Sequence, residues 1–135
     1  MDTVALVGRV LFSLLFVGAA FGHFKDRVAM TEYAKSKKLP MAQVAVLGSG
    51  VVVLLGGLSV MLGVWPDLGS LVLCAFLVVS AVLFHNFWAQ SDAATKQIDQ
   101  VMFMKNIALA GAALVLYTGF IGESLGATLT DPLFF

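Results

Sequence analysis

The sequence predicts an all-α integral membrane protein, a single domain over residues 1–135 that folds as a bundle of four transmembrane helices. Composition is the first observation behind this prediction. Of the 135 residues 60% are hydrophobic and 12% are charged, whereas a soluble domain has about 25% charged and about 45–50% apolar residues. The mean hydropathy of +0.97 therefore requires lipid around the surplus apolar surface. The other two observations are four long apolar segments and an uneven distribution of basic residues.

Each apolar segment is close to the about 20 residues that an α-helix needs to cross the hydrocarbon layer. Pro40 comes just before the second segment, where proline suits a first helical turn, and Pro66 separates the second from the third. The loops are short except the first, which is expected to hold a short interfacial segment, so sequence neighbours are expected to pack antiparallel. The predicted helices extend over residues 3–21, 41–64, 68–88 and 101–121.

All basic residues except Arg9 lie in or beside two of the three loops. Residues 25–38 supply five of them between the first and second helices, and Lys96 and Lys105 follow the third helix. In the loops on the opposite side all charged residues are acidic. By the positive-inside rule, the sequence predicts a multi-pass membrane protein with both termini outside. An acid, Asp2, stands where a signal peptide would be basic, so the first helix is expected to be retained as an anchor.

The composition and the motifs of the sequence argue against several classes of function. Net charge is zero and no basic stripe is present, which argues against nucleic acid as a partner. Cys74 is the single cysteine, so neither an internal disulfide nor a thiol-exchange pair is expected. Two histidines without a nearby acidic or thiol ligand fall short of usual metal coordination. Phosphate loops, nucleophile elbows and carboxylate pairs are also missing from the sequence.

Arg9 is predicted to be a structural charge inside the membrane. An ionised side chain at a helix centre costs about 2.5–3.5 kcal/mol on insertion scales, so it needs a partner. Arg9 lies about 7–8 Å along its helix, within reach of the outer interface. We expect either a salt bridge to Asp67 or Glu123, or a side chain extended to that interface. The helical wheel places near one face, directed at the bundle, the residues Arg9, Ser13, Phe16, Ala20 and His23.

Polar residues gather at the cytoplasmic ends of the predicted helices, and His85 and Trp88 are neighbours on one helix face at a spacing of three. A pocket there would suit a quinone, because it offers aromatic walls, groups that hydrogen-bond the carbonyls, and access from lipid. Histidine also exchanges a proton near physiological pH. The alternative is structural, since tryptophan favours the interface, lysine extends to it and asparagine caps helix ends. The candidate ligand-binding residues are His23, Lys25, His85, Trp88, Lys105 and Asn106.

Small residues mark candidate helix contacts at Gly18-x-x-x-Gly22, Gly56–Gly57 and Ala110–Gly111, because such positions let helix backbones approach closely in lipid. They favour a second hypothesis, a non-catalytic scaffold or assembly factor that binds a membrane protein partner or a second copy. A small-molecule permease is a weaker alternative, since few buried charges are present to line a polar path.

Five pieces of the sequence carry a family resemblance: GRVLFSLLFVGAAFGHFKD, TEYAKSKKLP, LLGGLSVMLGVWPDLGSLVL, LFHNFW and FMKNIALAGAALVL. In this order and spacing they are similar, over nearly the whole length, to the DoxX family of small four-helix bacterial membrane proteins. The resemblance aligns family positions with Arg9, Lys25, His85, Trp88, and the pair Lys105–Asn106. Where many members carry a glutamate before the paired glycines of the second helix, this chain has only Val51 to Val53.

The resemblance implies a small inner-membrane subunit of a redox or oxidative-stress-related assembly. Relatives are associated with thiosulfate:quinone oxidoreductase and with assemblies that handle oxidative stress. It leaves open whether the chain is an enzyme, at most as a subunit of a quinone-linked membrane oxidoreductase, and it makes a quinone the candidate cofactor.

Overall fold

The computed structural model describes residues 2–134 of the chain. The single-domain prediction for residues 1–135 includes two positions, 1 and 135, that lie outside this range. Within it the protein is helical and has no strand. The helices are α1 (Asp2–Lys25), α2 (Arg27–Ser36), α3 (Ala42–Leu62), α4 (Pro66–Phe84) and α5 (Ala93–Ile121), with a 3-10 turn, η1 (Phe87–Ala89), between α4 and α5.

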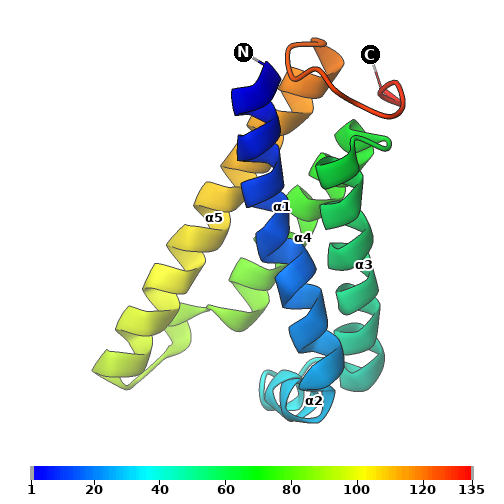
Figure 1. Ribbon diagram of the computed structural model, residues 1–135. Helices are drawn as coiled ribbons and strands as arrows, with labels where there is room; N and C mark the ends of the chain where they lie inside the picture. Colours follow the sequence, from blue (N-terminus) through cyan, green and yellow to red (C-terminus); the bar gives the residue numbers. More distant parts are fainter. Residues whose placement is uncertain (1, 135) are drawn as a thin grey trace.

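Four segments are long and apolar enough to cross a membrane: α1, α3, α4 together with η1, and α5. The prediction of an all-α membrane bundle is therefore confirmed. α1 packs against α3, α4 packs against α5, and α3 against α4 joins the two pairs. Both termini lie at one end of the bundle, and α2 lies across the opposite end (Figure 1).

The helix ends differ most from the hydropathy segments around the third loop. α5 begins at Ala93 and not near residue 101, because Asp92 caps it by accepting a hydrogen bond from the Thr95 backbone N–H at 2.9 Å. At 29 residues α5 is about 44 Å long, which exceeds a hydrocarbon layer of about 30 Å. α4 ends at Phe84, earlier than residue 88, because His85 and Asn86 leave the helical path.

The interior is built from close approaches of α3 to its two neighbours. A Cβ on Gly57 would lie 3.1 Å from the Phe16 Cβ on α1, and one on Gly56 would lie 2.9 Å from the Leu73 Cδ2 on α4. These glycines are therefore required for packing within the chain. By contrast, a Cβ on Gly18, Gly22 or Gly111 would meet no atom of residues 2–134 within 4 Å beyond its own helix backbone, so these three are not required for packing within one copy. The hydrophobic core of the bundle includes the buried side chains of Phe16, Val53, Val60, Leu73, Leu77 and Phe120.

At the end that carries both termini the segment after α5 (residues 122–134, the C-terminal segment) folds back over the bundle. Arg9 is 2% exposed, and its guanidinium donates to the backbone oxygens of Gly126, at 3.2 Å, and Ala127, at 2.8 Å. Among residues 2–134 it forms no ion pair with Asp67 or Glu123. The expected bundle-facing stripe is present, since Arg9, Ser13, Phe16 and Ala20 are the buried residues of α1.

Further contacts hold the C-terminal segment on the turn between α3 and α4. The Gly63 carbonyl accepts hydrogen bonds from the Leu129 and Thr130 backbones, at 2.9 and 3.1 Å. Asp67, fully buried, accepts one from the Phe134 backbone N–H at 2.7 Å. The segment therefore seals this end of the bundle with backbone groups that would otherwise need water.

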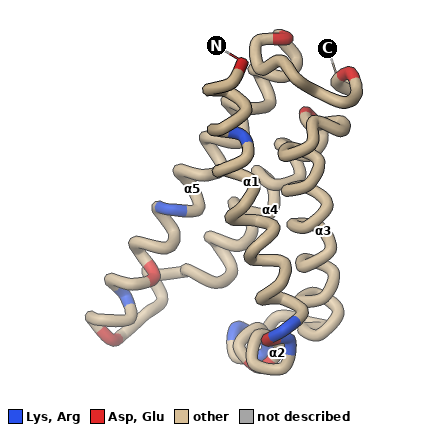
Figure 2. Tube along the Cα trace, in the orientation of Figure 1, with Lys and Arg blue, Asp and Glu red and all other residues tan. Residues whose placement is uncertain are grey.

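Charge is distributed unevenly along the bundle (Figure 2). Basic residues gather on and beside α2 and on the N-terminal half of α5, with some acidic residues among them, whereas the charged residues in the loops at the end that carries both termini are all acidic. This is the distribution on which the predicted orientation rests, and the orientation itself stays a prediction.

Candidate functional site

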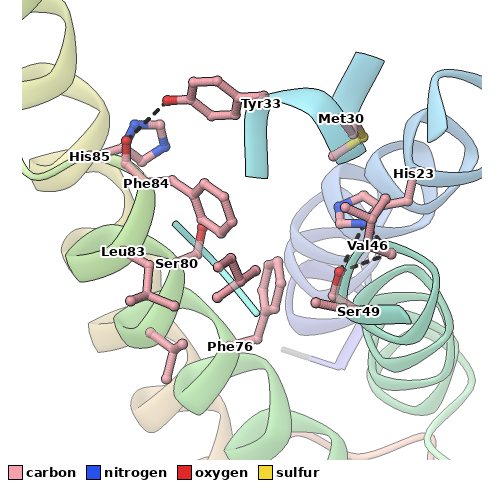
Figure 3. Close-up of a pocket in the computed structure, with 13 residues that line it drawn as sticks. His23, Met30, Tyr33, Val46, Ser49, Phe76, Ser80, Leu83, Phe84 and His85 are labelled. Atoms are coloured by element: carbon pink, nitrogen blue, oxygen red, sulfur yellow. Dashed lines mark hydrogen bonds between the residues drawn. The ribbon is translucent and has the colours of Figure 1, made fainter. Parts of the chain in front are cut away.

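A cavity of about 430 Å³ lies at the α2 end of the bundle, within the about 300–1,000 Å³ of small-molecule sites. One wall is α4, with Ser80, Phe84 and His85, and the opposite wall is the α1–α3 pair (Figure 3). Two residues of α2, Met30 and Tyr33, line the side of the cavity between these two walls (Figure 3). The rest of the lining is aliphatic or aromatic, including Leu39, Phe76 and Leu83.

His23 is in the last turn of α1, where that helix touches α3. A Cβ on Gly50 of α3 would lie 2.8 Å from the His23 Cβ, so glycine at this position permits the contact. The His23 Nδ1 lies 3.0 Å from the Val46 carbonyl oxygen and 3.0 Å from the Ser49 Oγ. One nitrogen of the ring is thus engaged by α3, and the ring lines the cavity.

His85 lies on the opposite wall, directly after the last residue of α4. Its Nδ1 is 3.4 Å from the Asp99 Oδ1 on α5. The structure therefore brings together in one cavity the two histidines that the sequence singled out, one from each helix pair. Both hold Nδ1 against protein, which orients the rings.

Asp99 is a residue that the sequence reasoning missed. It is 7% exposed, its Oδ2 accepts a hydrogen bond from Gln90 Nε2 at 2.7 Å, and the Lys37 Nζ is 3.9 Å from the same oxygen. Lys37 also donates to Asn86 Oδ1 at 2.9 Å. This cluster ties the end of α2 to the α4–α5 connection. An available signal was the Asp92–Thr95 start of α5, which extends the helix back through residue 99.

Tyr33 of α2 lines the side of the cavity that α2 covers. Its hydroxyl donates to the Phe84 carbonyl oxygen at 3.1 Å, and its ring stacks on that of Phe84 with centroids 5.8 Å apart. Burial raises the pKa of Tyr33 above its ordinary value, and the negative charge of Asp99 raises it further.

The other candidate residues do not line this cavity. Trp88 is 55% exposed and packs edge-on against Phe87 and Phe103, with centroids 5.3 and 5.7 Å away. Lys25 and Lys105 are exposed. Asn106 is buried and approaches the cavity only through Ser80, to whose Oγ it donates at 3.5 Å. Within residues 2–134, no three histidine, cysteine or acidic side chains converge in a way that would hold a metal ion.

Comparisons with known proteins agree with this architecture. A family model described as DoxX matches residues 4–86, a range that includes His23, Lys25 and His85 and ends before Asp99. The chain is also 28% identical over 118 residues to the inner membrane protein YqjF of Escherichia coli, which covers 85% of this chain and 82% of that protein. No solved structure matches the chain.

Proposed function

The chain belongs to the DoxX family and is a multi-pass protein of the bacterial inner membrane, and from that premise we propose that it binds a quinone in the cavity between its two histidines. In this proposal the protein acts as a small subunit of a redox or oxidative-stress-related membrane assembly. The cavity holds the quinone ring, and the tail extends into lipid.

One observation carries the proposal: His23 and His85 line the same largely apolar cavity from opposite walls. A quinone ring has two oxygens on opposite sides, so polar groups on opposite walls suit it better than one cluster would. Phe76 and Phe84 supply aromatic surface, and aromatic pairs stabilise a bound ring beyond the area that they bury. The largely apolar lining favours a lipid-soluble ligand over a charged one.

Binding is tested with the full chain purified in mild detergent and returned to lipid nanodiscs. Copurified lipids are extracted and searched for quinone, and affinity is measured by titration with a short-tailed ubiquinone analogue in its oxidised and its reduced form. We expect His23→Leu and His85→Leu each to weaken binding of the reduced form by about two- to tenfold, as the loss of one net hydrogen bond predicts. The matched control is Trp88→Leu, which changes a candidate residue that lies outside the cavity and should leave affinity unchanged.

Two results would count against the proposal. One is the absence of quinone from the extract together with no saturable binding of the analogue. The other is a loss of binding in Trp88→Leu without one in the histidine variants, which would locate any quinone site on the exposed aromatic cluster.

A second function, self-association or recruitment of a partner, is favoured by the glycines of α1. Gly18 and Gly22 form a small-x-x-x-small pair, and a Cβ at either position would have no atom of residues 2–134 within 4 Å beyond its own helix backbone. The pair therefore lies free for another helix, which such pairs accommodate in lipid. Gly111 of α5 is equally open and serves as the matched control.

This second function is tested by crosslinking in native membranes. Gly18→Leu and Gly22→Leu should reduce the crosslinked species, whereas Gly111→Leu and His85→Leu should not. Equal loss in Gly111→Leu would indicate a general effect of bulk on the lipid-facing surface, and the α1 interface would be abandoned.

A further inference from the structure

Most hydroxyl groups that line the cavity donate their hydrogens to acceptors within the protein. The Tyr33 hydroxyl donates to the Phe84 carbonyl oxygen at 3.1 Å, and the Ser49 hydroxyl donates to the Val46 carbonyl oxygen at 3.0 Å. Each oxygen keeps its lone pairs. Both groups are therefore acceptors toward a ligand, and among the lining hydroxyls only that of Ser80 has no acceptor assigned within residues 2–134.

The tautomer of His23 follows from its partners. The Val46 oxygen, 3.0 Å from Nδ1, is a carbonyl and only accepts. If Nδ1 carried no hydrogen, its lone pair would face the lone pairs of the Val46 and Ser49 oxygens at hydrogen-bond distance. In the neutral ring the hydrogen is therefore on Nδ1. Figure 3 shows this nitrogen joined to Val46 and Ser49, with the other ring nitrogen away from them. That second nitrogen, Nε2, is consequently an acceptor.

The same argument applies to His85. Its Nδ1 lies against the Asp99 carboxylate, which already accepts a hydrogen bond from Gln90 and has the Lys37 ammonium nearby. An ionised carboxylate only accepts, so the hydrogen of the neutral ring is on Nδ1 and Nε2 is again bare. Asp99 thus acts as a positioning residue for His85, in the way that a buried carboxylate fixes the tautomer of a histidine.

We propose that the cavity selects ligands that donate hydrogen bonds, and hence the hydroxyl-bearing quinol in preference to the quinone. This rests on the proposed function, since it names which form of that ligand the site prefers. A quinol carries two hydroxyl hydrogens, and the two Nε2 acceptors belong to histidines on opposite walls. The carbonyl oxygens of a quinone are themselves acceptors. A quinone therefore forms no hydrogen bond with either Nε2 atom.

The tautomers are tested without any ligand, by ¹⁵N NMR of histidine-labelled protein in nanodiscs at pH 8. Both rings are expected to carry the hydrogen on Nδ1. An asparagine amide is able to donate to Nδ1, so Asp99→Asn should move the hydrogen of His85 to Nε2 and leave His23 unchanged. Asp99→Glu should restore the original signal, and Asp131→Asn, an exposed acid at the other end of the chain, should alter neither ring. Hydrogen on Nε2 in the unmodified protein would overturn the proposal.

Selectivity is tested with a short-tailed hydroquinone, kept reduced, against its dimethyl ether, which has the same ring and tail but no hydroxyl hydrogens. The hydroquinone is expected to bind about tenfold more tightly, from two net hydrogen bonds. This ratio should shrink about threefold in Asp99→Asn and recover in Asp99→Glu. Equal affinity of the two compounds would overturn the selectivity while the cavity remains a binding site. If hydroquinone, ether and quinone all fail to bind, the proposed function is overturned together with it.

Discussion

Arg9 on α1 and Ala127 in the C-terminal segment are joined by a hydrogen bond of 2.8 Å across 118 positions of sequence. The cation is 2% exposed and is stabilised by carbonyl dipoles of Gly126 and Ala127, with the Phe120 ring 5.7 Å from its carbon Cζ. A charge inside a membrane-spanning helix is thus stabilised by irregular backbone at the end of the bundle that carries both termini.

Replacing Arg9 is expected to release the C-terminal segment. Arg9→Met keeps an extended apolar side chain but removes both charge-assisted hydrogen bonds, each worth about 1.5–3 kcal/mol. Hydrogen exchange should accelerate at Leu129 and Thr130, whose N–H groups bond Gly63. The measurement is exchange mass spectrometry of the protein in nanodiscs. Val7→Met, at an exposed site one turn or less away, is the control, and protection retained in Arg9→Met would show that the segment is held by its other bonds.

Bulk at the α1–α3 contact is expected to destabilise the fold. Gly57→Leu places side-chain atoms where a Cβ alone is already 3.1 Å from the Phe16 Cβ, and overpacking costs about 1–3 kcal/mol. The midpoint of thermal unfolding in detergent should fall. Gly111→Leu adds the same atoms at an open position and should change it little. Equal midpoints for the two variants would contradict the close approach of α1 and α3.

The titration of Tyr33 should report the charge of Asp99. The carboxylate disfavours the phenolate and so raises the pKa of Tyr33. Asp99→Asn is therefore expected to lower this pKa, which remains above the ordinary value because burial persists. A Tyr117→Phe background isolates the signal, read from the ultraviolet absorbance of the phenolate. An unchanged titration in Asp99→Asn would mean that the two groups are not close.

Orientation is tested with single cysteines in a Cys74→Ser background. With both termini outside, Ser124→Cys should react with a membrane-impermeant maleimide in spheroplasts, whereas Ser36→Cys should react only after lysis. Both positions are exposed, so reactivity reports the side of the membrane. The inverse pattern would reverse the orientation and place the histidine cavity at the outer leaflet.

The membrane fold was predictable because hydropathy measures what the bilayer itself requires, about 20 apolar residues for each crossing. The start of α5 was not, because residues 93–100 are polar and hydropathy detects only the part of a helix that lies in hydrocarbon. The Asp92 cap carries that information instead. Asp99, the residue that holds His85, lies in this polar turn, and so it escaped a search confined to the apolar segments.

The partners of Arg9 illustrate a second limit. The sequence indicated that a charge in a span needs compensation, and acids at the same membrane side were the natural candidates. The actual acceptors are backbone oxygens of Gly126 and Ala127. Every residue has such an oxygen, so composition and spacing carry no sign of which ones are used.

The seal formed by the C-terminal segment has a consequence for biosynthesis. The chain enters the membrane from its N-terminus, so α1 with Arg9 is inserted long before residues 126 and 127 leave the ribosome. During that interval the guanidinium lacks its acceptors, and so does the buried carboxyl of Asp67, which accepts from Phe134. The nascent bundle must keep both groups near water or translocon until residues 126–134 have emerged. Assembly of this end of the bundle therefore follows the synthesis of residues 126–134, and chains that stall before residue 126 would present an unsatisfied intramembrane charge to membrane quality control.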